Sequence, residues 1–480
     1  MSITKASTAS RTARHTSSLV LAAMCLGVLL AQLDSMVVNL ALKRIGAELH
    51  SGVSGLQWVL DAYNLTYASL LLTGGTLGDL YGRRRIFAAG SAAIILGTAV
   101  CGLAPDTAIL IAGRALTGLG AALVIPSSLA ILAVTYADAN QRAHALGIWA
   151  SCNGLAMVIG PTIGGLLVDS AGWRSIFLLT MPIAALTFAM SMWAVPESSH
   201  AEGRHLDLPG QSLAIAGLGA LSFAAIEGAR MGWTALPILA GFAAFALLLP
   251  VFVAVQRRTQ GPLVPMSLFR HGTFVASLLV AGLMTFGMYG MLFLLPIALQ
   301  VAHGASAFMA GIELLPNSVV FLIVSNLSGW LAVRFGARAM MTAGMAAMGG
   351  GLLLIAALPA DAPYLALALG LAIIGVGLGL NTGPVNSVAV AAVPPARSGT
   401  ASGLVNTARM IGATLGIAVL GAVFAAFAGQ SSGDAAAVTQ GARAAFLVGA
   451  AGELAGALIA LGFVRAGALQ GRAAARRGYQ

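Results

Sequence analysis

Apolar runs long enough to cross a membrane alternate with short polar connections along almost the whole chain. A membrane-spanning helix needs about 20 mostly apolar residues, and by that measure we expect about fourteen spans. The expected spans are 18–40, 56–77, 86–104, 108–134, 143–167, 175–194, 210–228, 235–255, 273–299, 307–332, 339–358, 364–391, 399–427 and 441–464. The pattern predicts an all-α polytopic membrane protein.

One loop sequence occurs twice in this pattern. GTLGDLYGRRR follows the second span, and the related GWLAVRFGAR follows the tenth. Such duplication is typical of secondary transporters built from two related halves, although two basic loops could share glycines by chance. We therefore expect a cytoplasmic tail (1–17), an N-terminal six-helix bundle (18–195), cytoplasmic linkers with two inserted helices (196–272), a C-terminal six-helix bundle (273–464) and a basic tail (465–480).

Charge sets the orientation of these spans. The chain is 59% hydrophobic and 8% charged, with 25 Lys and Arg against 15 Asp and Glu. The basic residues lie mostly in one set of short loops and at both ends, which indicates cytoplasmic termini and argues against nucleic-acid binding. The two lysines, Lys5 and Lys43, fit no phosphate loop, and the seven histidines are scattered. We expect no enzyme, no metal and no cofactor other than an ion gradient.

Charges inside the spans are the candidate functional groups. Asp34 lies deep in the first span, where a carboxylate is costly unless it faces a cavity or a partner, so it is a candidate proton or cation site. Asp61 begins the second span and is either proton-linked or at the outer interface. Arg114, in the fourth span, must pair, and Asp34 and Asp61 are the candidates. Such a pair could move protons or be purely structural.

Three further in-span charges have less certain roles. Glu313 lies in the first turns of the tenth span, where the helix dipole eases its charge, and it is either a coupling site or structural. Arg409, in LVNTARMIG, has no evident acidic neighbour. Glu453 lies midway along the last span without an evident physical reason.

The basic turn after the second span is a candidate cytoplasmic gate, with Gly75, Asp79, Gly82, Arg83 and Arg84 as its key residues. Its arginines place it in water, and its glycines allow close backbone approach. Asp79 lies at a helix C-terminus, where an anion is disfavoured. It therefore needs a partner, either an arginine of this turn or the N-terminus of another helix.

The fifth span carries the sequence MVIGPTIGG, in which Gly160, Pro161, Gly164 and Gly165 combine small residues with a helix-disrupting proline. Small residues permit close helix packing, and proline removes a backbone donor. This pattern predicts a pliable seam, or close packing alone.

Taken in order, these motifs resemble the major facilitator superfamily, in particular the fourteen-helix drug:proton antiporters of the EmrB/QacA type. GTLGDLYGRRR resembles the cytoplasmic loop signature, LDSMVVNLAL and QWVLDAYNL resemble the first two helices, and GRALTGLGAA is similar to the fourth-helix proton-transfer motif. GPTIGG resembles the antiporter motif, with Ala156 where a glycine is usual. The similarity covers nearly the whole length.

The resemblance implies proton-coupled export of lipophilic, often cationic compounds by alternating access, and hence multidrug efflux and antibiotic resistance. It also implies the bacterial cytoplasmic (inner) membrane, and some relatives work with a periplasmic adaptor. Two alternatives stay open: an exporter dedicated to one metabolite or antibiotic, and a non-transporting sensor or assembly partner on the same fold.

Overall fold

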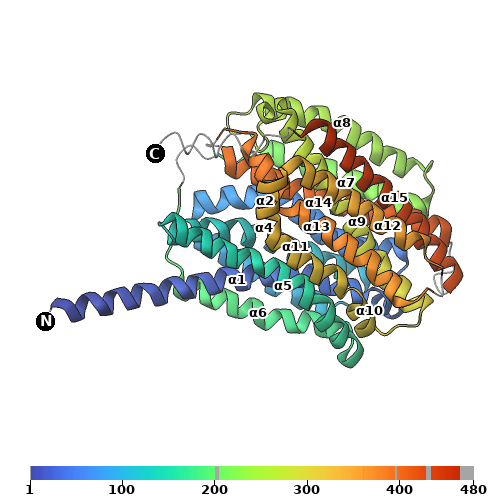
Figure 1. Ribbon diagram of the computed structural model, residues 1–480, viewed down its shortest axis with the longest axis horizontal. Coiled ribbons are helices and arrows are strands. Elements are labelled where there is room, and N and C mark those ends of the chain that lie inside the picture. The colour runs from blue at the N-terminus through green and yellow to red at the C-terminus, as the bar shows by residue number, and fades with distance from the viewer. Residues whose placement is uncertain (1, 201–204, 360–361, 395–396, 429–433, 465–480) are drawn as a thin grey trace.

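The computed structural model describes residues 2–200, 205–359, 362–394, 397–428 and 434–464, so the basic tail lies outside the described residues. The described part is a bundle of long α-helices (Figure 1). In chain order the helices are α1 (Ser2–Glu48), α2 (Val53–Tyr81), α3 (Arg83–Gly102), α4 (Thr107–Thr135), α5 (Ala139–Ala171), α6 (Arg174–Ala194), α7 (Leu208–Met231), α8 (Leu236–Arg258), the 3-10 helix η1 (Met266–Arg270), α9 (Gly272–Ala302), α10 (Ala307–Glu313), α11 (Leu315–Phe335), α12 (Ala337–Ala357), α13 (Tyr364–Ala391), α14 (Ser398–Ala428) and α15 (Ala435–Phe463).

The expected membrane-spanning helices are present. Within the described ranges, thirteen spans are long and apolar enough to cross a membrane, with α10 and α11 counted together as one span of 29 residues. Helix α2 also has 29 residues and completes the fourteen, but it carries buried polar side chains, among them Gln57, Asp61 and Asn64. The all-α polytopic fold is confirmed.

The tenth span differs from the expected single helix. The chain breaks at Leu314, so Glu313 is the last residue of the short α10 and does not lie in the first turns of a long helix. Pro316 lies in the first turn of α11, where its missing N–H removes a hydrogen bond that would continue α10. Glu313 therefore lies between two helix ends, the C-terminus of the short α10 and the N-terminus of α11, whose N-cap is Leu314, and its role in coupling stays a prediction.

Helices before and after the insertion pack in the same pattern. In the first half α1 packs on α5 and α6, α4 on α2 and α3, and α3 on α6. In the second half α9 packs on α14 and α15, α13 on α11 and α12, and α12 on α15. The inserted helices belong to neither pattern: α8 packs on α7, and α7 packs on α2 of the first half and α14 of the second. We call the two sets the N-terminal and C-terminal bundles.

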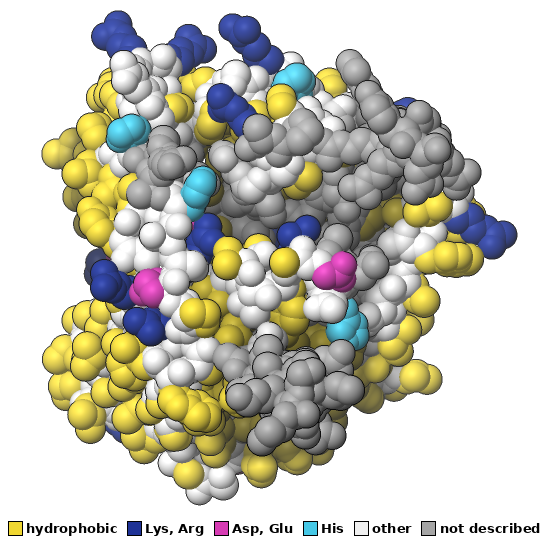
Figure 2. Space-filling view, turned by 90° about the vertical axis from the view of Figure 1, so that its left-hand side faces the viewer, with side chains coloured by type: hydrophobic (Ala, Val, Ile, Leu, Met, Phe, Trp, Pro, Cys, Tyr) yellow, Lys and Arg dark blue, Asp and Glu magenta, His cyan; other side chains and the backbone are white. Residues whose placement is uncertain are grey.

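The two ends of the molecule differ in charge. Helix α1 projects beyond the bundle at the left of Figure 1. Figure 2 looks onto that end, where Lys and Arg side chains outnumber Asp and Glu. We call it the inner end; it carries the α2–α3 turn at Gly82, and the opposite, outer end carries the α1–α2 connection. A basic inner end agrees with a cytoplasmic position.

Candidate functional site

Asp34 and Arg114 form a buried ion pair between α1 and α4. The Arg114 Nη1 lies 2.5 Å from the Asp34 Oδ2, and the two side chains are 1% and 2% exposed. The Arg114 Nε also donates to the carbonyl oxygen of Val59 on α2, at 3.0 Å. Of the two partners considered for Arg114, the structure places Asp34 beside it.

Tyr63 covers this pair from α2. Its ring centroid lies 4.7 Å from the Arg114 guanidinium carbon, a cation–π contact, and its hydroxyl donates to the carbonyl oxygen of Ala31 at 2.8 Å. Three helices of the N-terminal bundle thus meet at one charged group. Any change in the charge of Asp34 acts on α1, α2 and α4 together.

Asp61 lies on another face of α2 and does not join the ion pair. It is fully buried and faces Thr414 of α14, in the C-terminal bundle. Neither of its carboxylate oxygens has a hydrogen bond of normal geometry within the described chain. It is a carboxyl group at the contact between the bundles, not at the outer surface.

Glu313 lies far from this group, at the outer end of the C-terminal bundle. It lines a cavity of about 130 Å³ together with His303, Tyr364 and Arg443. Its Oε2 is buried without a hydrogen bond among the described residues. The structure therefore brings Asp34 and Arg114 together, and it places Asp61 at the bundle interface and Glu313 elsewhere.

The α2–α3 turn is held by charge pairs. Asp79 accepts two hydrogen bonds from Arg83, at 2.8 and 3.1 Å. Of the two partners expected for Asp79, the structure therefore shows the arginine of this turn. Gly82 has φ +108°, and a side chain there would meet the carboxylate of Glu197, which follows α6. Glu197 in turn lies 3.7 Å from Arg84 and accepts from its backbone N–H at 3.1 Å.

Glycine lets α2 approach α4 just before this turn. A side chain on Gly75 would contact Pro126 of α4, and one on Gly78 would meet the Ser127 hydroxyl. The turn is thus packed against α4 of the N-terminal bundle. We expect it to move together with that bundle. Its gate role stays a prediction.

The fifth-span motif packs on both bundles. Side chains on Gly160 and Gly164 would meet Met36 and Val37 of α1, and one on Gly165 would meet the backbone of α10. The carbonyl oxygen of Pro161 lies where a side chain on Gly311 of α10 would be. The small residues therefore allow α5 to fit between α1 and α10.

Hydrogen bonds between the bundles gather at the outer end. Gln57 Nε2 donates to the carbonyl oxygens of Ile417 and Ala418 on α14, at 2.8 and 3.0 Å. Lys43 Nζ donates to the carbonyl oxygen of Gln300 on α9, at 2.5 Å. Asp169, at the end of α5, accepts from the backbone N–H groups of Ala307 and Phe308, at 3.2 and 2.8 Å. These hydrogen bonds join the two bundles at the outer end.

Sequence reasoning missed the role of Asp169. Asp169 lies at the end of α5 and accepts from the first two backbone N–H groups of α10, and a backbone partner gives no signal in the sequence. No group of three or more His, Cys, Asp or Glu residues suited to a metal ion occurs in the described part of the chain.

Comparison with known proteins agrees with this architecture. Residues 24–417 match the Major Facilitator Superfamily. The chain is 39% identical over 413 residues to a multidrug resistance protein, Stp, of Mycobacterium tuberculosis, covering 86% of this chain and 77% of the relative. It is 38% identical to a methylenomycin A resistance protein of Bacillus subtilis (84% and 87% covered) and 32% identical to the multidrug efflux pump LfrA of Mycolicibacterium smegmatis (85% and 81%).

A solved structure shows the same fold. A bacterial homologue of the human lysosomal transporter Spinster, in an inward-facing and unoccupied conformation, matches with a TM-score of 0.68 over 93% of this chain and 96% of the other, at 18% identity. The protein is a multi-pass membrane protein of the Major Facilitator Superfamily. The family expected from the motifs is thereby confirmed.

Proposed function

We propose that this protein exports lipophilic compounds from bacteria in exchange for protons, by alternating access across the cytoplasmic membrane. The buried Asp34–Arg114 pair carries the proposal. A proton on Asp34 removes one charge of the pair and leaves Arg114 buried and unpaired, which costs several kcal/mol and favours a rearrangement of α1, α2 and α4. The relatives named for multidrug resistance and efflux support export.

The fold supplies what such a cycle needs. Hydrogen bonds join the two bundles at the outer end, whereas the basic turn at the inner end is braced by the N-terminal bundle. Inward proton movement provides about 2.3 kcal/mol per charge per 100 mV, so the proton gradient is the proposed energy source and no organic cofactor is invoked. Asp61, a buried carboxyl group at the contact with α14, is the proposed partner for a lipophilic cation.

The test uses purified protein in liposomes with an imposed pH gradient and ethidium as substrate. Wild type should move ethidium in response to the gradient, and Asp34→Asn should lose that movement. Asp106→Asn is the matched control, because Asp106 caps α4 at an exposed position and should transport normally. Equal movement in wild type and Asp34→Asn would remove Asp34 from the coupling path. No movement by folded wild type would favour an exporter dedicated to one compound.

A further inference from the structure

Arg409 is a cation at the contact between the bundles that has no acidic partner within the described chain. It lies on α14, where its Nη2 donates to the carbonyl oxygen of Thr382 on α13 at 3.0 Å. Its Nε is buried and makes no hydrogen bond to any described residue. The titratable groups that interact with it electrostatically are two tyrosines, Tyr67 and Tyr289, and no carboxylate.

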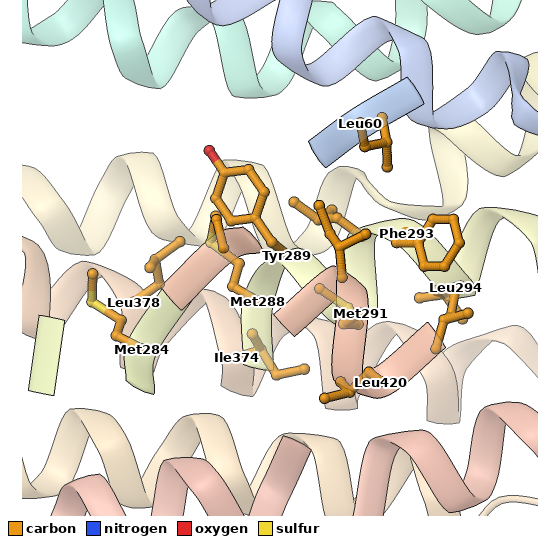
Figure 3. Packing of buried hydrophobic residues seen from close by; sticks show 14 of the residues in the cluster. Leu60, Met284, Met288, Tyr289, Met291, Phe293, Leu294, Ile374, Leu378 and Leu420 are labelled. Atoms are coloured by element: carbon orange, nitrogen blue, oxygen red, sulfur yellow. The ribbon is translucent and has the colours of Figure 1, made fainter. Parts of the chain in front are cut away.

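These tyrosines come from opposite bundles. Tyr67 lies on α2 and Tyr289 on α9, and the Tyr289 hydroxyl is within hydrogen-bonding reach of Ser35 on α1. Figure 3 shows this hydroxyl directed away from Met284 and Ile374 of the packed cluster. The arginine therefore lies among hydroxyl groups contributed by both halves of the protein.

The α2–α14 contact shows how this group relates to the other polar residues. The two helices run antiparallel: Gln57 meets Ile417 near the outer end, Asp61 meets Thr414 below it, and Leu72 faces Gly403 nearer the inner end. Tyr67 and Arg409 fall between the last two levels. The arginine thus lies part-way through the molecule, on the surface along which the bundles meet.

The group formed by Arg409, Tyr67 and Tyr289 is rich in hydrogen-bond donors and lacks an anion. A guanidinium and phenol hydroxyls offer several N–H and O–H donors, but the surrounding side chains supply no anion. An arginine without a counter-charge inside a membrane protein is costly, and a carboxylate is its best planar, bidentate partner. The contrast with Arg114 is direct, because that arginine already holds Asp34.

We propose that Arg409, with Tyr67 and Tyr289, binds the acidic group of exported lipophilic acids. This inference rests on the proposed export function and adds a substrate class to it: aromatic or aliphatic compounds with a carboxylate. Lipophilic cations use Asp61, and lipophilic acids use Arg409, on the same surface between the bundles. A small inorganic anion such as chloride is the competing occupant, and it would make the arginine structural.

The experiment measures growth inhibition in an efflux-deficient bacterium that expresses the full chain. The acidic compounds are nalidixic acid and fusidic acid, and the cations are ethidium and tetraphenylphosphonium. Wild type should raise the inhibitory concentration of both classes. Arg409→Gln should lose most of the protection against acids, about tenfold or more for a lost charge-assisted contact, and keep the protection against cations. Arg258→Gln is the matched control, because it also removes one positive charge, and Arg258 is exposed at the end of α8, away from the surface between the bundles.

Two further variants keep the test decisive. Arg409→Lys retains the charge without the planar fork and should keep part of the protection against acids. If Arg409→Gln does not reach the membrane, Tyr289→Phe replaces it and should weaken protection against acids alone. The assignment would be overturned if Arg409→Gln still protected against acids. It would also be overturned if Arg409→Gln lost protection against acids and cations equally at normal protein levels. Wild type that exports cations but no acid would overturn it and leave export intact, whereas export of neither class would remove both proposals.

Discussion

Replacing Asp169 by alanine should open the outer end. The carboxylate accepts two backbone N–H groups of α10 and so joins the end of α5 to the start of the tenth span, across the two bundles. A hydrogen bond to a charged group contributes about 1.5–3 kcal/mol, and the lower part of that range applies because the side chain is 28% exposed. With the longer of the two bonds discounted, the pair contributes about 2–3 kcal/mol to closure, or about a 30- to 150-fold shift in the ratio of closed to open protein.

The assay is a distance measurement between spin labels in lipid nanodiscs. Cysteines at Leu103, after α3, and Leu365, in α13, are exposed positions at the outer ends of the two bundles. The native Cys25, Cys101 and Cys152 are replaced first. Wild type should show mainly short distances, and Asp169→Ala should show a larger population of long ones.

A matched variant separates closure from helix capping. Asp106→Ala removes the cap of α4 inside one bundle, at a cost of about 1 kcal/mol in stability, and should leave the distances unchanged. If Asp169→Ala has the wild-type distance distribution, the bonds to α10 do not hold the outer end closed. The reasoning from the hydrogen bonds would then be refuted.

Three further predictions concern packing and charge. Asp34→Asn should lower the free energy of unfolding by about 3–5 kcal/mol, because Arg114 stays buried and charged without a partner. The double variant Asp34→Asn with Arg114→Gln should lose less stability, and thermal unfolding in detergent measures both variants. Gly165→Val should push α5 from α10 and lengthen the same label distances, and an unchanged distribution would show that the contact can adjust. Gly82→Ala should cost about 1–2 kcal/mol, because a positive φ disfavours a side chain and Glu197 fills the space; an unaltered unfolding temperature would contradict this.

The pairing of the in-span charges was predictable, because a charge inside a membrane span is costly unless a partner of opposite charge lies beside it. A partner was necessary for Asp34 and for Arg114, and Asp79 had an arginine four residues away, at the start of α3. The choice between Asp34 and Asp61 was not predictable, since both lie at depths that Arg114 could reach. It is decided by the rotation of α2, which turns Asp61 toward α14 and the carbonyl oxygen of Val59 toward Arg114.

Contacts to backbone groups were beyond reach of the sequence. Asp169 caps α10 and Glu197 binds the start of α3 through N–H groups, which every residue but proline carries. The sequence of side chains therefore does not show which backbone N–H groups will bind a given carboxylate. The break before α11 did leave one, because Pro316 stands close behind Glu313 and marks where a continuous helix loses a hydrogen bond.

The position of α7 makes the protein asymmetric toward the surrounding lipid. The bundles meet along two surfaces, one where α2 faces α14 and one where α5 faces α10 and α11. Helix α7 packs on the first, with Gln211 bonded to Ser69 near the inner end and Glu227 to Trp58 near the outer end. Among the helices that the structure describes, none covers the second surface in this way, and Ile163 and Leu166 of α5 are exposed beside it. A compound dissolved among the acyl chains would therefore meet an extra helix on one flank, whereas on the other flank it would meet α5 and the start of the tenth span directly.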